Sequence, residues 1–510
     1  MSDESTAVPI ETMIDALFEQ YVGVGTSRAA VVGLSDETGL SHWRGHGSAN
    51  DQDELPDADM LFPIASMTKS FACCATLVAR DAGLLDLEDP ITKHVPEFQL
   101  AANDSGEIVP TIRMLLSMSG GLTEDNAWVD PFIDAPVDRV LHEAARGVRL
   151  SSRPGTTYEY SNLGYALVGI AVGRAVGMPF ADYVQQNLLE PLGLTSTFYD
   201  KDAPADRPRA SGYSLDDRGD WIAYGPRTSD AFLAAGGLVS TIRDLATWIT
   251  WLGSALRESP TDESVLSTAS RRELHRIHVM TPPAVTIAPD GGLAVVTGGY
   301  GLGVQVRQDL RRGLIVGHAG GLPGFTLYMT WHPASGRGLV ALTNSHRGDL
   351  VAMCDRALGM VLADHDVPAS VVRLWPETHE LRHQTDALIR RWDDALAVRI
   401  FADNVDFDQP LDERRAEIAR LVEIVGPLLD APGASRLVSA DSPADVTWSM
   451  AGERGELLCM IHLTPVEPAA VQELVVRAVP DGHPRPVELQ PDRFTAGPSY
   501  TTTHRIIATT

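Results

Sequence analysis

The sequence predicts an α+β fold in two domains, and three observations lead to this prediction. The chain has 510 residues, more than one ordinary hydrophobic core accommodates. Strand-like segments stand at both ends of the first 365 residues around a helical middle, which favours an antiparallel sheet flanked by helices over alternating βαβ units. Charged helices and a new set of strands follow. We therefore expect a larger domain over residues 1–365 and a smaller C-terminal accessory α+β domain over residues 366–510.

The chain opens with a helix and a pair of strands. Residues 28–34 and 41–47 have the composition of strands and are joined by a turn that contains Gly39. The apolar residues of the preceding segment recur at helical spacing: Ile10, Met13, Ile14, Leu17 and Phe18. We expect an amphipathic helix over residues 9–21, followed by a two-stranded hairpin.

A buried helix is expected from residue 66 to about residue 82. The segment after Ser70 consists of good helix formers that are apolar nearly all round, and Gly83 lies where a C-cap would lie. Ser66 opens this helix and Lys69 follows three residues later, so the hydroxyl and the amine would share one face. A serine at such a position is by itself more often only an N-cap.

Further helices and strands follow along the chain. A continuously apolar helix over residues 165–176 should be fully buried, and residues 349–363 should form the last helix of the first domain. The strands expected between them cover residues 299–306, 314–318, 325–331 and 338–344. In the second domain we expect helices over 378–401 and 410–429 and strands over 445–450, 456–463 and 471–479.

Composition limits the partners and the compartment. A net charge of −27 argues against nucleic acids and acidic membrane surfaces. The cysteines (Cys73, Cys74, Cys354 and Cys459) are too scattered for a disulfide framework. No apolar stretch approaches the roughly 20 residues of a membrane span, and residues 1–6 lack the features of a signal peptide. We therefore expect a cytoplasmic enzyme that acts on small molecules or short peptides, and its assembly into a homo-oligomer stays open.

The pairing of Ser66 with Lys69 indicates nucleophilic catalysis. A serine hydroxyl becomes a good nucleophile when a neighbour accepts its proton, and a lysine in a dry pocket can have its pKa lowered enough to do so. Arginine cannot, because it stays protonated in proteins. The contrast is informative here, since the chain has only three lysines (Lys69, Lys93 and Lys201) but 38 arginines.

Two further motifs follow in order, Tyr160-x-Asn162 and His318-Ala319-Gly320. The series Ser-x-x-Lys, Tyr-x-Asn and basic-x-Gly resembles the penicillin-recognising serine hydrolases, which include class C β-lactamases, DD-peptidases, D-aminopeptidases and related esterases. The likeness covers about residues 10–365. It implies a β-lactamase/transpeptidase-like catalytic domain with a helical subdomain, and hydrolysis through an acyl-enzyme without a cofactor.

The resemblance also implies roles for individual residues. Ser66 would be the nucleophile, and Lys69 would activate it and stabilise charge. Tyr160 would be a second general acid or base, and we expect its phenol, held near an ammonium group, to ionise more easily than usual. Asn162 would hydrogen-bond both Lys69 and the substrate carbonyl.

The last motif would provide the oxyanion hole and part of the substrate site. By resemblance, the backbone N–H groups of Ser66 and Gly321 would bind the oxyanion, and glycines at 320 and 321 would let the strand approach the substrate. His318 stands where the β-lactamases and DD-peptidases have a lysine that binds a carboxylate. An imidazole is mostly neutral at pH 7, so His318 and Gly320 predict a substrate-binding surface with little affinity for carboxylates.

These residues predict an acyl-enzyme hydrolase of small peptides, amides or esters, similar to D-aminopeptidases or esterases. One alternative is a β-lactamase or DD-carboxypeptidase, and another is a binding or sensor protein that acylates slowly. A third is a zinc peptidase, because His379-Glu380-Leu381-Arg382-His383 matches His-Glu-x-x-His. That match begins a highly charged helix without an apolar surround, so we interpret it as coincidental and expect no metal.

Overall fold

The computed structural model describes residues 8–482 except 103–105, 107, 130–131, 226–229, 258–261, 288–292, 310–311, 346, 366–371 and 373. The chain divides into two compact units, Met1–Val367 and Pro368–Thr510. Each unit is described by itself.

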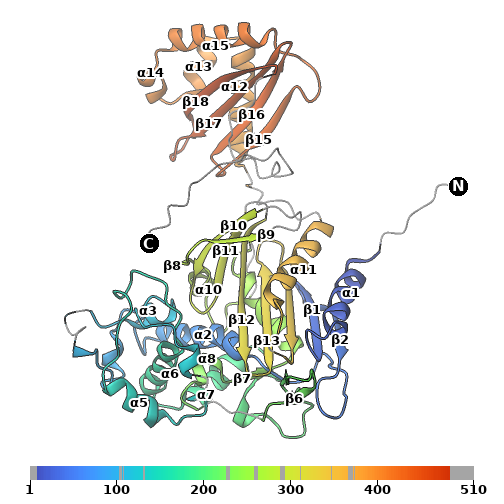
Figure 1. Cartoon of the computed structure of the whole chain (residues 1–510). Coiled ribbons are helices and arrows are strands. Elements are labelled where there is room, and N and C mark those ends of the chain that lie inside the picture. The colour runs from blue at the N-terminus through green and yellow to red at the C-terminus, as the bar shows by residue number, and fades with distance from the viewer. Residues whose placement is uncertain are drawn as a thin grey trace, which may run out of the picture. The chain divides into compact units, whose positions relative to one another are not determined.

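The first unit is built on an antiparallel sheet with the strand order β2-β1-β14-β13-β12-β11-β10-β8, and β9 pairs with β10 (Figure 1). The N-terminal strand β1 (Ala29–Asp36) pairs with β14 (Arg337–Thr343), which joins segments from both ends of the unit. The other strands are β2 (Gly39–Gly47), β8 (Val279–Met280), β9 (Ala284–Ile287), β10 (Leu293–Tyr300), β11 (Gln305–Asp309), β12 (Gly313–Leu322) and β13 (Phe325–His332). The expected α+β class is confirmed.

Helices cover both faces of this sheet because its strands are apolar on both faces. In β1, Ala30 and Val32 pack with α1 (Ile10–Gly23) and α11 (Leu350–Asp364), while the intervening Val31 belongs to the main core. The main core also holds α2 (Thr68–Asp81) and α9 (Ile242–Ser254). The sheet is therefore the central layer of the unit, and α2 carries the Ser66 region against it.

Helices and the loops between them make up most of the segment between β2 and β8, which agrees with the predicted helical middle. Its other helices are α3 (Ile112–Leu116), α4 (Asn126–Val129), α5 (Val137–Ala145), α6 (Asn162–Val176), α7 (Phe180–Val184), α8 (Leu233–Gly236) and α10 (Thr268–Leu274), with single turns at η1 (Ala65–Met67), η2 (Ile91–Lys93), η5 (Gln185–Leu189) and η6 (Asp200–Asp202). Short strands β3 (Phe62–Pro63), β7 (Leu238–Ser240) and β4 (Phe198–Tyr199) form one small sheet, and β5 (Tyr213–Leu215) pairs with β6 (Trp221–Ala223).

Helices α2 and α6 are the buried helices that the sequence predicts. Gly83 adopts a φ of +74° after the end of α2 and donates its N–H to the Arg80 carbonyl at 2.8 Å, as a C-capping glycine does. Within the part of the chain that the structure describes, no single helix is both long and apolar enough to cross a membrane. The segments Asn162–Val176 and Phe180–Leu189 meet these criteria only as a pair, and that pair is bent by 76°.

The second unit is an antiparallel sheet in the order β15-β16-β17-β18, preceded by helices that pack around the buried Trp448 (Figure 1). Its helices are α12 (Pro376–Arg390), α13 (Asp394–Ile400), α14 (Asn404–Asp408) and α15 (Leu411–Val425), and its strands are β15 (Ser435–Ser439), β16 (Asp445–Gly452), β17 (Gly455–Leu463) and β18 (Val471–Pro480). The single helix predicted over residues 378–401 is in fact two helices, because Asp393 caps a new helix by accepting from the N–H groups of Ala395 and Leu396.

Candidate active site

Ser66 lies at the entrance to α2, in a single 3₁₀ turn rather than in the helix itself. Ala65 has a φ of +46°, outside the right-handed helical region, so no helix extends back past it. The turn η1 spans Ala65–Met67, and α2 begins at Thr68. Ser66 is partly exposed, whereas the residues on either side of it are buried. The turn therefore presents one hydroxyl at the surface of an otherwise closed core.

Strand β12 runs against this turn. A Cβ atom at Gly320 would lie 2.6 Å from the Ile64 carbonyl oxygen and 3.2 Å from the Ala65 Cβ, so only glycine permits this approach. Gly321, the next residue, is exposed and pairs with Thr326 of β13. The two backbones predicted to form an oxyanion hole are thus neighbours, although that role stays a prediction.

Lys69 is fully buried one helical turn after Ser66. Its Nζ donates to Ser66 Oγ at 3.0 Å, to Asn162 Oδ1 at 2.7 Å and to the Ala235 carbonyl at 2.8 Å. Burial lowers the pKa of Lys69 to about 7, although the negative charge of Asp125 opposes this shift. Above that pH the amine is neutral, and its lone pair is available to the Ser66 proton.

The amide of Asn162 is held from two sides. Its Oδ1 accepts from Lys69, and its Nδ2 donates to Asp125 Oδ1 at 3.1 Å and to Asn126 Oδ1 at 2.8 Å. The predicted contact between Asn162 and Lys69 is therefore present. Asp125 and Asn126 were not among the predicted site residues.

Tyr160 hydrogen-bonds Ser66, and its ring centroid lies 4.9 Å from Lys69 Nζ. Burial raises the pKa of Tyr160 well above its usual value, and the charges of Asp125 and Glu124 raise it further. The expectation of an easily ionised phenol is wrong, because burial outweighs the hydrogen bond to Ser66, which lowers the pKa of Tyr160. Tyr160 is a neutral hydroxyl that can pass a proton on.

His318 is buried beneath the site, with 2% of its surface exposed. Its Nδ1 lies 2.6 Å from the Ala319 carbonyl oxygen, which can only accept, so Nδ1 carries the proton and Nε2 accepts from the Tyr300 hydroxyl at 2.8 Å. Burial and the charge of Lys69 lower the pKa of His318 to about 3. The imidazole is neutral and both its nitrogens already have partners within the protein.

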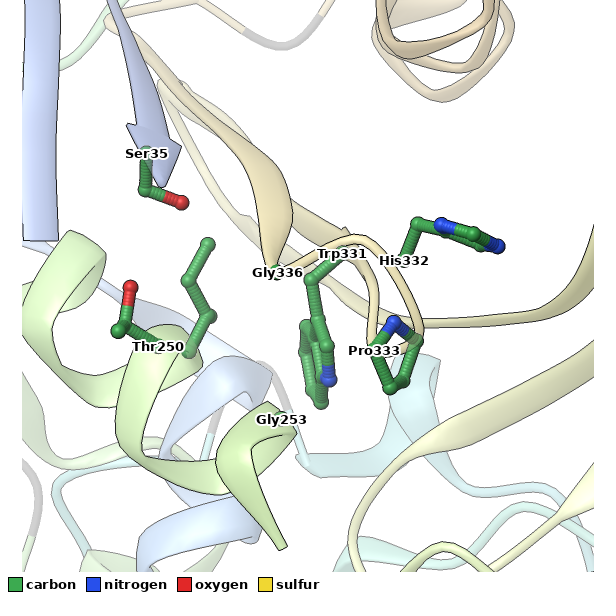
Figure 2. A pocket seen from close by; sticks show the side chains of 8 residues that line it. Ser35, Thr250, Gly253, Trp331, His332, Pro333 and Gly336 are labelled. Carbon is green, nitrogen blue, oxygen red and sulfur yellow. The ribbon is translucent and has the colours of Figure 1, made fainter. Parts of the chain in front are cut away.

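A small crevice elsewhere in the first unit contains none of the predicted site residues. It lies between α9 and the turn that joins β13 to β14, and Figure 2 shows Gly253 of α9 beside Trp331 and Pro333. Trp331 lies at the opposite end of β13 from Thr326, the residue that pairs with Gly321. The candidate site at Ser66 is therefore separate from this crevice.

The His-Glu-x-x-His segment lies in α12 of the second unit, and both His379 and His383 are exposed. Among the described residues, no group of three or more His, Cys, Asp or Glu side chains is arranged to hold a metal ion.

Comparison with known proteins identifies the family of this chain. The family model described as Beta-lactamase matches residues 14–360. Protein flp of Staphylococcus aureus (strain MRSA252) is 25% identical over 287 residues, which are 56% of this chain and 52% of that protein. The chain thus matches about half the length of this curated relative.

Solved structures agree on the fold. The octameric penicillin-binding protein homologue from Pyrococcus abyssi has 16% identity and a TM-score of 0.59, over 91% of this chain and 99% of that chain. The D-amino acid amidase from Ochrobactrum anthropi SV3, complexed with L-phenylalanine amide, has 23% identity and a TM-score of 0.52, over 70% of this chain and 99% of that chain. The chain belongs to the beta-lactamase family of serine hydrolases, and the predicted resemblance is confirmed.

Proposed function

We propose that this protein hydrolyses small amides, peptides or esters through an acyl-enzyme on Ser66. The observation that carries the proposal is the 3.0 Å hydrogen bond between Ser66 Oγ and Lys69 Nζ. Lys69 is fully buried and loses its proton near pH 7, so it is a base already in contact with the nucleophile.

The reaction would proceed in two halves. In the first, Ser66 Oγ attacks the substrate carbonyl carbon while Lys69 Nζ takes the hydroxyl proton, and the N–H groups of Ser66 and Gly321 face the oxyanion. The leaving amine or alkoxide then takes a proton from Tyr160, which is reprotonated from Lys69. In the second half, water attacks the acyl carbon and loses its proton to Lys69 Nζ, either directly or through the Tyr160 hydroxyl, which gives up its own proton as it receives one. The C–O bond to Ser66 then breaks, and Ser66 Oγ takes this proton back from Lys69.

The charges around the site favour a substrate with a free amino group over one with a carboxylate. The imidazole of His318 is neutral and committed to Tyr300 and Ala319, so it offers no cation to a carboxylate. The carboxylate of Glu124 is exposed, and its Oε1 accepts from the N–H of Asn126, the residue that contacts the Asn162 amide. This arrangement supports aminoacyl amides or esters as substrates, and disfavours β-lactams and C-terminal D-alanine.

A comparison of substrates tests the proposed function. The panel contains a short-chain nitrophenyl ester, D- and L-aminoacyl nitroanilides and a chromogenic cephalosporin. We expect steady turnover of the ester and of at least one nitroanilide, and slow hydrolysis of the cephalosporin. A single burst without turnover would instead indicate a binding or sensor protein, and efficient cephalosporin hydrolysis would indicate a β-lactamase.

The Glu124→Gln variant should raise KM for aminoacyl nitroanilides roughly three- to tenfold, because a charge-assisted contact with the substrate ammonium is lost at an exposed position. KM for a nitrophenyl ester without an amine should stay unchanged. The matched control is Glu19→Gln on α1, which packs on the opposite face of the sheet from α2. Equal effects on both substrate types would rule out recognition of the amine by Glu124.

We also propose that residues 366–510 are an accessory domain without catalytic groups. The second unit has its own core around Trp448, Leu457 and Ile461, which supports independent folding. The related penicillin-binding protein homologue from Pyrococcus abyssi is octameric. We propose that this chain also forms a homo-oligomer, and light scattering at several protein concentrations would measure its oligomeric state.

Turnover should be unaffected by excess EDTA and by His379→Ala. The exposed imidazole of His379 belongs to no metal-type cluster of the described residues, and the proposed mechanism uses the side chains of the first unit alone. Steady-state assays with and without chelator measure this. Loss of activity that added Zn²⁺ restores would favour the zinc-peptidase alternative.

A further inference from the structure

We propose that Asp125 is a positioning residue of this active site: its carboxylate fixes the amide of Asn162 and supplies the negative charge that faces Lys69. The expected effect of Asp125 on kcat rests on the proposed function, whereas its expected effect on the titration of Lys69 can be measured without turnover.

Asp125 lies in the loop before α4 and only 7% of its surface is exposed. Its Oδ1 accepts from the backbone N–H of Asn162 at 2.8 Å and from Asn162 Nδ2 at 3.1 Å. Its Oδ2 accepts from Ser161 Oγ at 2.9 Å and from the N–H of Leu163 at 2.8 Å. One buried carboxylate therefore links two separate chain segments at the start of α6.

Helix capping does not explain all of these contacts. Ser161 already caps α6, because its Oγ accepts from the N–H of Gly164 at 3.1 Å. The bond to Asn162 Nδ2 lies outside the helix backbone. Because a carboxylate only accepts, it requires the NH₂ end of the amide to face Asp125 and the oxygen to face Lys69. If the amide were free to rotate, its oxygen and NH₂ group could exchange places, and Lys69 Nζ would then lose this acceptor.

Asp125 is also the charged partner of Lys69. The other titratable groups that face this amine come from its own helix (Cys73), the loop before α6 (Tyr160), α6 (Tyr165) and β12 (His318). Tyr300 of β10 contacts this set through Tyr165 and His318. Burial keeps the pKa of each thiol and phenol raised and that of the imidazole lowered, so all of them are neutral near pH 7. The Asp125 carboxylate therefore opposes the desolvation of Lys69 and keeps the amine from losing its proton at a still lower pH.

The scarcity of lysine makes a direct test possible. Protein labelled with ¹³Cε-lysine has signals from only Lys69, Lys93 and Lys201. A Lys93→Arg variant removes one signal and so assigns it to Lys93, and the two remaining signals belong to the exposed Lys201 and the buried Lys69. We expect the Lys69 signal to titrate near pH 7 in the wild type. In Asp125→Asn, which removes a negative charge, its midpoint should fall by roughly half a unit to one unit.

Kinetics give the second measurement. We expect kcat of Asp125→Asn to fall roughly ten- to a hundredfold, because the Asn162 amide is no longer held in one orientation. The acid limb of kcat/KM should move to lower pH together with the NMR midpoint. Asp125→Glu, which keeps the charge but displaces it, should restore the midpoint more fully than kcat.

The control is Asp244→Asn, because Asp244 is also a buried carboxylate (6% exposed) that accepts from the Ser196 N–H and the Thr197 hydroxyl. It should lower the melting temperature without moving the Lys69 midpoint. If Asp125→Asn behaved like this control, with an unmoved midpoint and a normal pH profile, Asp125 would be structural only and our inference would be wrong. A shifted midpoint in a protein that hydrolyses nothing would uphold the inference and reject the proposed function.

Discussion

Ser66→Ala should reduce kcat/KM at least roughly 10⁴-fold, as removal of the nucleophile does in other serine hydrolases. Ser66 is the hydroxyl that contacts both Lys69 and Tyr160, and it is partly exposed while the lysine beside it is buried. The variant should stay folded, since the lost atom packs in a turn that remains partly open. Initial rates with the preferred nitroanilide measure the effect, and mass spectrometry should find an acyl adduct on the wild type alone.

The matched control for this variant is Ser70→Ala in the same helix. Ser70 Oγ donates to the Met67 carbonyl at 2.8 Å and accepts from Trp248 Nε1 at 3.0 Å, so its loss should cost about 1–2 kcal/mol of stability. Its kcat should remain within about fivefold of the wild type, because a buried structural hydrogen bond acts on the reaction only indirectly. If Ser66→Ala kept more than about a thousandth of the activity, another nucleophile would have to be sought.

The sequence predicts those parts of the site that depend on local geometry. Ser66 and Lys69 are one helical turn apart, and their hydrogen bond follows from that spacing. The glycines at 320 and 321 predict a close approach to the backbone of their strand. The structure shows such an approach, because β12 passes so near Ile64 that only glycine fits at position 320. The pairing of β1 with β14 agrees with strand patterns at both ends of the first unit.

The residues that the sequence does not reveal act through tertiary contacts. Asp125 precedes Asn162 by 37 residues and lies in a polar loop, so no periodic pattern connects the two. Tyr300 reaches His318 only because β10, β11 and β12 are adjacent in the sheet. Strand β15 was not predicted, since it is short, most of its residues are polar and none of them is buried.

The error about Tyr160 has a different physical origin. The sequence places a tyrosine near a lysine, and an ammonium group lowers the pKa of a neighbouring phenol. It does not show that both groups are buried, and burial raises the pKa of Tyr160 and lowers that of Lys69. Burial therefore contradicts only the expected easy ionisation of Tyr160, and the proposed role of Lys69 as the base that activates Ser66 is unchanged.

Lys69→Arg should retain less than about one hundredth of the wild-type kcat/KM, because arginine keeps the charge but does not release its proton. Wild-type activity should rise as the pH passes through about 7, where the buried amine becomes neutral, and this limb should be missing from the variant. The control is Lys93→Arg, the same exchange at a side chain that is 57% exposed and pairs with Asp89. The decisive measurement is kcat/KM from pH 5 to pH 9. If Lys69→Arg kept more than a tenth of the activity with the same acid limb, Lys69 would supply charge alone, and the base that takes the Ser66 proton would have to be another group.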